Sequence, residues 1–143
     1  MGVLDSGVIE TRAQLPLDQR VQLIFDGVAT VLDEHAPAVL VLEDLYAEYR
    51  FPRTALLMAH ARGVVCLVAR QRGVRVMSLA PAEVKRAITG HGGAHKEQVQ
   101  RAVQRLLALP EPPRTSHVAD ALALALTGLR RLSFGGALRG VPR

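Results

Sequence analysis

The stretch SHVADALALAL, residues 116–126, carries the strongest indication of fold and site in this sequence. Ser and Thr are favoured helix N-caps, Ala and Leu are strong helix formers, and a helix that is apolar all round is a buried one. We therefore predict a buried final helix that begins at Ser116. Its first turn carries His117 and Asp120, whose i, i+3 spacing points both side chains from one face.

Burying an imidazole and a carboxylate is costly unless something binds them. A divalent metal ion bound by His117 and Asp120 meets this need, because a neutral histidine and a carboxylate are both metal ligands. The alternative is that Asp120 merely complements the helix dipole, although that explanation does not account for His117. The start of this helix is the best candidate for a functional site.

Upstream of this helix, strand and helix patterns alternate, which predicts one α/β domain over residues 1–132 and a basic flexible tail over residues 133–143. The predicted strands cover residues 3–11 (a short strand or hairpin arm), 38–42 and 74–79. The predicted helices cover residues 16–33, 54–71, 81–88, 96–107 and 116–132. A flexible loop is predicted over residues 89–95 and a proline-rich linker over residues 109–115.

The net charge of +5 is distributed unevenly. Residues 1–50 hold nine acidic and three basic residues, whereas residues 60–110 hold nine basic and two acidic residues. A basic region suggests a polyanionic partner, although solvated surface charge explains it equally well. No apolar run reaches the length of a membrane span and no signal peptide begins the chain, so we expect a cytoplasmic protein. The single cysteine, Cys66, lies in an apolar run and is expected to be buried.

Further candidate residues follow the predicted strands and loops. Glu43 comes directly after the apolar strand, where sites form in open α/β sheets, although a polar strand cap is the alternative. Lys96 opens a helix after a glycine-rich loop and is a candidate phosphate ligand or simply a surface lysine. Lys85 and Arg86, just before that loop, are open to the same two interpretations.

Aromatic and basic side chains also gather in the segment after Glu43. This segment contains Tyr46, Tyr49, Arg50, Phe51 and Arg53. Aromatic side chains interleaved with arginine stack on unpaired bases, but they also pack loops onto a core. Both interpretations of this segment stay open.

Five segments, taken in order, share the pattern of one family. They are VLVLED (39–44), AHARGV (59–64), AEVKR (82–86), KEQVQ (96–100) with its preceding loop, and SHVADALA (116–123). Together they resemble the RuvC family of Holliday-junction resolvases over about residues 7–130. The resemblance implies an RNase H-like fold, in which helices flank a mixed sheet. It also implies a homodimer, formed around the helix that begins at Thr54, which cuts two strands of a four-way DNA junction symmetrically.

The resemblance further implies roles for individual residues. Glu43 matches the family's strand-end metal ligand, Asp120 matches the ligand of the last helix, and His117 stands where members carry Asp or His. Lys85 and Lys96 match basic residues near the scissile phosphate.

Tyr46 matches an aromatic residue that probes the open centre of the junction, and Arg50 and Arg86 complete the expected DNA-binding set. The cofactor would be Mg²⁺ or Mn²⁺, with two ions in each active site. A junction-binding, branch-migrating motor complex would be a further partner.

One departure from the family pattern concerns the first strand, whose Gly-Ile-Asp-Pro-Gly-like motif supplies a metal-bridging Asp. This sequence has no such segment, and Asp5 would lie in a hairpin instead. A misassigned start, a fragment or an inactive homologue would each explain this, and we favour the first because the other site residues are present. We expect the chain as given to be inactive and poorly stable, because a sheet without its central strand has unpaired backbone groups.

Two alternative functions remain open from the sequence. One is a catalytically inactive RNase H-like module that binds nucleic acid, and the other is a small metal-dependent hydrolase of nucleotides.

Overall fold

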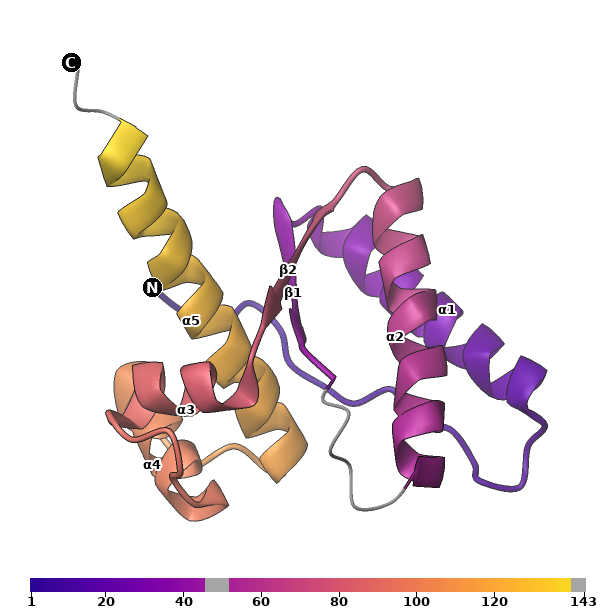
Figure 1. The fold of residues 1–143 in the computed structure, drawn as a ribbon, viewed down its shortest axis with the longest axis horizontal. Coiled ribbons are helices and arrows are strands. Elements are labelled where there is room, and N and C mark those ends of the chain that lie inside the picture. Colours follow the sequence, from indigo (N-terminus) through magenta and orange to yellow (C-terminus); the bar gives the residue numbers. More distant parts are fainter. Residues whose placement is uncertain (46–51, 140–143) are drawn as a thin grey trace. The chain divides into compact units, whose positions relative to one another are not determined.

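A computed structural model describes residues 1–45 and 52–139, and Figure 1 shows its helices and strands. The chain forms two compact units. One comprises Ile9–Ser78, and the other comprises Met1–Val8 together with Leu79–Arg143.

The unit Ile9–Ser78 is built on a βαβ arrangement. Its elements are α1 (Leu17–His35), β1 (Val39–Glu43), α2 (Pro52–Gln71) and β2 (Arg75–Leu79), the last residue of β2 belonging to the other unit. Among the described residues, β1 and β2 form a two-stranded parallel sheet, as expected when a helix connects two neighbouring strands. The predicted α/β class is therefore confirmed.

The core of this unit lies where α1 packs against α2. Ala29 and Leu32 of α1 are buried with Val68 and Ala69 of α2. Partly buried apolar side chains surround these four residues: Phe25, Val28, Leu40, Val64, Val74 and Val76. Because Leu40 and Val76 belong to the strands, the same core holds the helices against β1 and β2.

The end of α2 leads the chain directly into β2. Gly73 adopts a left-handed conformation with φ of 66°. Its N–H bonds the Arg70 carbonyl at 3.2 Å, and the Val74 N–H bonds the Ala69 carbonyl at 2.9 Å. These two bonds define a Schellman motif, which favours glycine because a Cβ is disfavoured at positive φ. The predicted end of this helix at residue 71 is confirmed.

The predicted strand or hairpin arm over residues 3–11 is wrong, because this segment has no regular secondary structure. Ile9 instead packs over α1, where a Cβ added to Gly27 would lie 2.8 Å from the Ile9 Cδ1 atom. The Arg20 Nε–H donates to Thr11 Oγ1 at 3.1 Å. The β-branched residues therefore find contacts on a helix, and β-propensity depends on such context.

The second unit contains α3 (Pro81–Thr89), α4 (Lys96–Leu106) and α5 (Ser116–Arg139), which pack against one another. Its core is made of small and branched side chains: Val84, Ile88, Ala94, Val99, Ala102, Val103, Ala119, Ala123 and Leu126. Two polar contacts connect α5 to α3. Arg130 Nη1 donates to the Ala87 carbonyl at 2.7 Å, and Arg131 pairs with Glu83 at 2.7 Å.

The prediction for the final helix is corrected in two ways. First, α5 continues to Arg139 rather than ending at Leu132, so part of the expected flexible tail is helical. Second, α5 is not buried all round, because Ala121, Ala125 and Leu129 are exposed. Alanine and leucine favour a helix whether or not a given face is covered, so composition alone does not identify the buried face.

The segment expected to be a flexible loop is folded by its own hydrogen bonds. The His91 N–H bonds Thr89 Oγ1 at 3.2 Å, the Gly93 N–H bonds His91 Nδ1 at 3.1 Å, and Ala94 is buried. Cys66, expected to be buried, is only half-buried. None of the helices in the described part of the chain has the length and apolarity that a membrane crossing requires.

An ion pair joins the last turn of α1 to the end of α2, and it makes a pH-dependent prediction. Arg72 Nε donates to Asp33 Oδ1 at 2.6 Å, and this hydrogen bond lowers the pKa of Asp33 below 3.8. The carboxyl of Asp33 has a lower pKa in the folded chain than in the unfolded chain, so at a pH between these two values the unfolded chain binds more protons. The ion pair therefore contributes its full stability above the unfolded pKa of Asp33. This contribution is lost as the pH falls through the folded pKa. Asp33→Asn should therefore lower the urea midpoint at pH 7, and the difference from wild type should vanish in acid. Arg72→Gln should give the same profile, and a pH-independent difference would contradict the assignment.

The left-handed conformation of Ala108, after the end of α4, leads to a second prediction. The Leu109 N–H bonds the Gln104 carbonyl at 2.9 Å around Ala108, whose φ is 49°. A Cβ in this left-handed conformation costs about 1–2 kcal/mol, which exceeds the entropic cost of a glycine. Ala108→Gly should raise the free energy of unfolding by about 0.5–1 kcal/mol in urea titrations. Ala125→Gly, in the exposed interior of α5, should lower it by about 1 kcal/mol, and equal effects would show that the conformation of Ala108 is not strained.

Candidate metal and DNA site

Glu43 is the last residue of β1, and its side chain is exposed. The sequence predicts a strand over residues 38–42 with Glu43 directly after it, and the structure extends the strand by one residue to include Glu43. The next residue, Asp44, is half-buried and pairs with Arg62 of α2 at 3.3 Å. Arg62 Nε also donates to the Glu43 carbonyl at 3.4 Å. Glu43 therefore stands at a strand end whose neighbouring backbone is held by a helix.

Arg62 is the residue that sequence reasoning missed. It lies inside the segment AHARGV, which was used only for the family resemblance. Besides Glu43 and Asp44, it donates from Nη2 to Ser78 Oγ at 2.5 Å, near the end of β2. The sequence did offer an indication of this role: Arg62 lies in the middle of a helix expected to pack on a sheet, and an arginine there requires polar partners.

The start of α5 carries two of the predicted ligands. Thr115 precedes the helix, and its Oγ1 accepts the Val118 N–H at 3.2 Å, while its carbonyl accepts the Ala119 N–H at 3.1 Å. His117 and Asp120 are both exposed, whereas Ala119 is buried. The prediction that this pair would be buried is therefore wrong, because the helix buries the opposite side. Their shared polar face is available to an ion or substrate.

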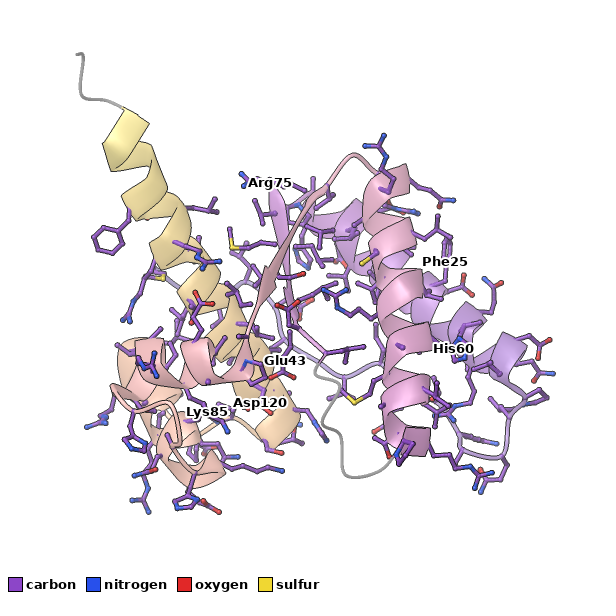
Figure 2. All side chains as sticks on the ribbon, viewed as in Figure 1. Phe25, Glu43, His60, Arg75, Lys85 and Asp120 are labelled. Atoms are coloured by element: carbon purple, nitrogen blue, oxygen red, sulfur yellow. The ribbon has the colours of Figure 1, made fainter. Side chains whose placement is uncertain are left out.

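The predicted basic residues lie on α3 and α4 of the same unit. Lys85 of α3 is half-buried and Arg86 is exposed, and Figure 2 labels Lys85 together with Asp120. The Arg86 guanidinium lies over the loop, since a Cβ on Gly92 would be 3.3 Å from Arg86 Nη2. Lys96 is the first residue of α4 and is exposed.

The start of α4 is fixed by a capping box. The His95 N–H donates to Gln98 Oε1 at 2.8 Å, and the His95 side chain accepts from the Gln98 backbone. Lys96 is therefore carried by an ordered helix start.

Other predicted contacts fall outside the described residues. Tyr46 and Arg50 lie there, as do Tyr49 and Phe51. Their proposed contacts with DNA stay predictions.

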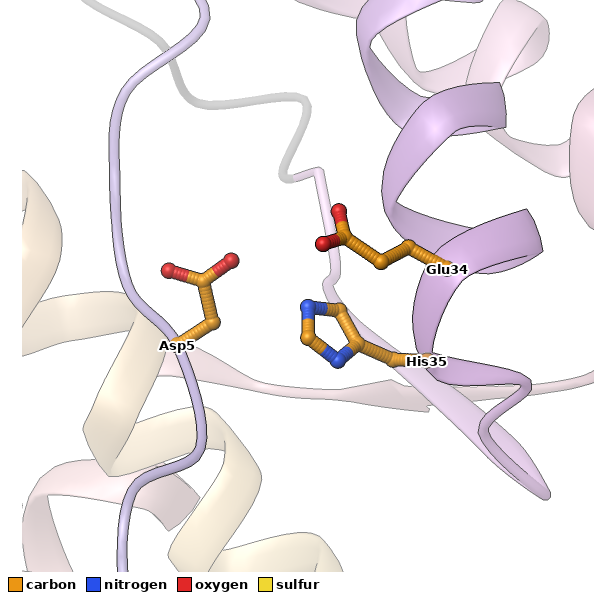
Figure 3. Close-up of side chains that lie close together, drawn as sticks. All are labelled: Asp5, Glu34 and His35. Atoms are coloured by element: carbon orange, nitrogen blue, oxygen red, sulfur yellow. The ribbon is translucent and has the colours of Figure 1, made fainter.

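Figure 3 shows Glu34 and His35 as neighbours on the last turn of α1, together with Asp5. Asp5 is not in a hairpin, because its segment has no regular structure. Asp5 belongs to one unit, whereas Glu34 and His35 belong to the other.

The structure gathers five of the predicted residues in one unit. They are Lys85, Arg86, Lys96, His117 and Asp120. Glu43 belongs to the unit Ile9–Ser78 and is described there.

The donor set suits a hard divalent cation. Glu43 and Asp120 offer carboxylate oxygens, His117 offers an imidazole nitrogen, and all three side chains are exposed. Carboxylates are the ligands that Mg²⁺ and Mn²⁺ prefer, with an occasional histidine. Each of these residue types therefore suits a metal-dependent reaction on a phosphate ester, and the unit that contains Asp120 also carries the cations Lys85 and Lys96.

Comparison with known proteins decides the family. The model of the crossover junction endodeoxyribonuclease RuvC matches residues 1–128. This chain belongs to the RuvC family. It is 44% identical over 136 residues to RuvC of Leifsonia xyli, covering 92% of this chain and 65% of that protein. It is 44% identical over 124 residues to RuvC of Rhodopirellula baltica, covering 87% of this chain and 70% of that protein.

Solved RuvC structures also match. Thermus thermophilus RuvC in complex with a Holliday junction substrate superposes with a TM-score of 0.88 and 38% identity, covering 94% of this chain and 81% of that one. The chain thus has the RNase H-like fold that the resemblance implied. RuvC nucleases depend on a metal ion.

The helix start that carries His117 and Asp120 makes a testable prediction. Thr115→Ala removes the hydroxyl that accepts the Val118 N–H, so it should lower the free energy of unfolding by about 1 kcal/mol. Ser116→Ala is the matched control, and its effect should stay within about 0.5 kcal/mol. Equal losses in urea titrations of the two variants would show that Thr115 does not cap α5.

Proposed function

We propose that this chain is an endonuclease that resolves four-way DNA junctions by metal-dependent phosphodiester hydrolysis. The observation that carries the proposal is the family match over residues 1–128, together with the presence of the predicted carboxylates at a strand end and on an exposed helix face. The match to a RuvC structure solved with a Holliday junction supports the same substrate. The chain spans 65% of the Leifsonia relative's length, so activity, substrate and partners are proposed for it rather than transferred.

In this proposal each residue has a defined task. Glu43, His117 and Asp120 would hold Mg²⁺ or Mn²⁺, with two ions per site. When bound, such ions supply an activated water and stabilise charge on the leaving oxygen. Lys96 would offset the negative charge that develops on the phosphate, because an ammonium stabilises charge that accumulates in the transition state.

DNA contacts would come from both described and undescribed segments. Lys85 and Arg86 on α3 would contact the phosphate backbone, and phosphate contacts fix position without reading sequence. Tyr46 and Arg50 would contact the open centre of the junction. The basic excess of residues 60–110 supports a polyanionic substrate.

The proposed assembly is a homodimer formed around α2. Two sites related by a two-fold axis would match the symmetry of a four-way junction. We further propose that the dimer works in the cytoplasm with a branch-migrating motor complex. Residues 1–132 would form the resolvase domain, followed by a basic extension.

The decisive experiment compares Asp120→Asn with wild type on a synthetic four-way junction in Mn²⁺. Cutting by wild type would overturn the expectation, drawn from the absent first-strand Asp, that the chain as given is inactive, and no cutting by wild type would contradict the proposal. Because metal ions contribute several kcal/mol to stabilising the transition state, cutting should fall by about 100-fold or more. Junction binding, followed by fluorescence anisotropy, should persist because the phosphate contacts remain. Asp18→Asn removes an exposed carboxylate in the first turn of α1 and should leave cutting unchanged.

Each alternative function has its own outcome in this experiment. A binding module would bind the junction without cutting, with no dependence on metal. A nucleotide hydrolase would ignore the junction and lack the steep salt dependence of multiple phosphate contacts.

A further inference from the structure

Arg62 is the only described side chain for which the structure gives hydrogen bonds to the ends of both strands of the sheet. It projects from α2 and donates to the Glu43 carbonyl at 3.4 Å, to Asp44 Oδ1 at 3.3 Å and to Ser78 Oγ at 2.5 Å. All four residues belong to the unit Ile9–Ser78, so the arrangement is internal to one compact body. We propose that Arg62 is a positioning residue that sets the direction in which Glu43 presents its carboxylate to the metal. This inference rests on the proposed role of Glu43 as a metal ligand.

The contacts of Arg62 hold the chain at Glu43 and at the residue that follows it. Arg62 holds the carbonyl of Glu43 itself and the side chain of the next residue, Asp44. The third contact, to Ser78, attaches the same guanidinium to the neighbouring strand. Together they restrict the backbone torsions around Glu43, and those torsions determine where its Cβ points. Arg62 therefore helps to set the direction in which the side chain of Glu43 leaves the strand.

Only a guanidinium suits this task. Its planar fork presents five N–H donors in a fixed geometry, so one group can serve three acceptors at once. A lysine ammonium concentrates its three donors at a point and cannot hold two separated strand ends in the same way. The side chain of Arg62 is 29% exposed and that of Asp44 is 45% exposed, so water screens their ion pair. The contribution of Arg62 is therefore geometric rather than a large gain in stability.

Groups that orient a metal ligand change the affinity of the site without touching the metal. Substituting such groups costs about 10- to 100-fold in metal affinity. The same reasoning predicts that Arg62→Gln weakens Mn²⁺ binding by about 10-fold, with Arg62→Lys close to it. Arg70→Gln is the matched control, because Arg70 is an exposed arginine of the same helix in its last turn.

The test measures Mn²⁺ binding to the full chain from the electron paramagnetic resonance signal of the free ion, alongside thermal unfolding. Arg62→Gln and Arg62→Lys should raise the Mn²⁺ dissociation constant with little change in the unfolding midpoint, and Arg70→Gln should change neither. Ser78→Ala should show a smaller rise, because it removes one of the three contacts.

A second comparison tests whether Arg62 acts by positioning Glu43 or by supporting the structure in general. In a Glu43→Gln background, Arg62→Gln should cause no further loss of Mn²⁺ affinity, because the ligand that it orients is already gone. Equal losses in both backgrounds, or unchanged affinity in Arg62→Gln, would overturn the inference while leaving the nuclease proposal intact. A wild-type chain that binds no Mn²⁺ and cuts no junction would overturn both.

Discussion

The packing of α1 against α2 is the constraint on which the unit Ile9–Ser78 depends. Ala29 and Leu32 of α1 are buried in one cluster with Val68 and Ala69 of α2. Because the apolar residues of β1 and β2 join the same core, the helices and strands are held as one body. The position of α2 on the strands in turn brings Arg62 to the strand ends. The contacts of Arg62 with the strand ends thus depend on the apolar packing of α2.

In the second unit, one face of α5 packs in the core and the other face carries candidate site residues. On α5, Ala119 and Ala123 face the core, while His117 and Asp120 on the other side are exposed. A helix surface divides naturally in this way, since residues three or four apart share a face. The ionisable groups therefore remain in contact with solvent, and folding does not incur the cost of burying them.

Most helices and strands were predictable because residues at their ends act through their own backbone preferences. Pro81 opens α3 and Gly90 ends it in a left-handed conformation, and both residues act through their own backbone restrictions. The segment over residues 3–11 was mispredicted because a strand needs a partner, and the contacts of Ile9 lie on α1 instead. The candidate site residues were predicted from residue type and order. The exposure of His117 and Asp120 and the contacts of Arg62 were not predicted.

The sequence by itself determined the α/β alternation, the helix ends and the family, because these depend on propensity, periodicity and residues at set spacings. It also supplied the candidate residues for binding a metal ion and DNA. Only the tertiary structure decided which face of α5 is buried, where residues 3–11 lie, and which side chain holds the end of β1. Those features depend on contacts between residues far apart in the chain, such as Arg62 with Asp44 and Ser78, and no local pattern specifies such contacts.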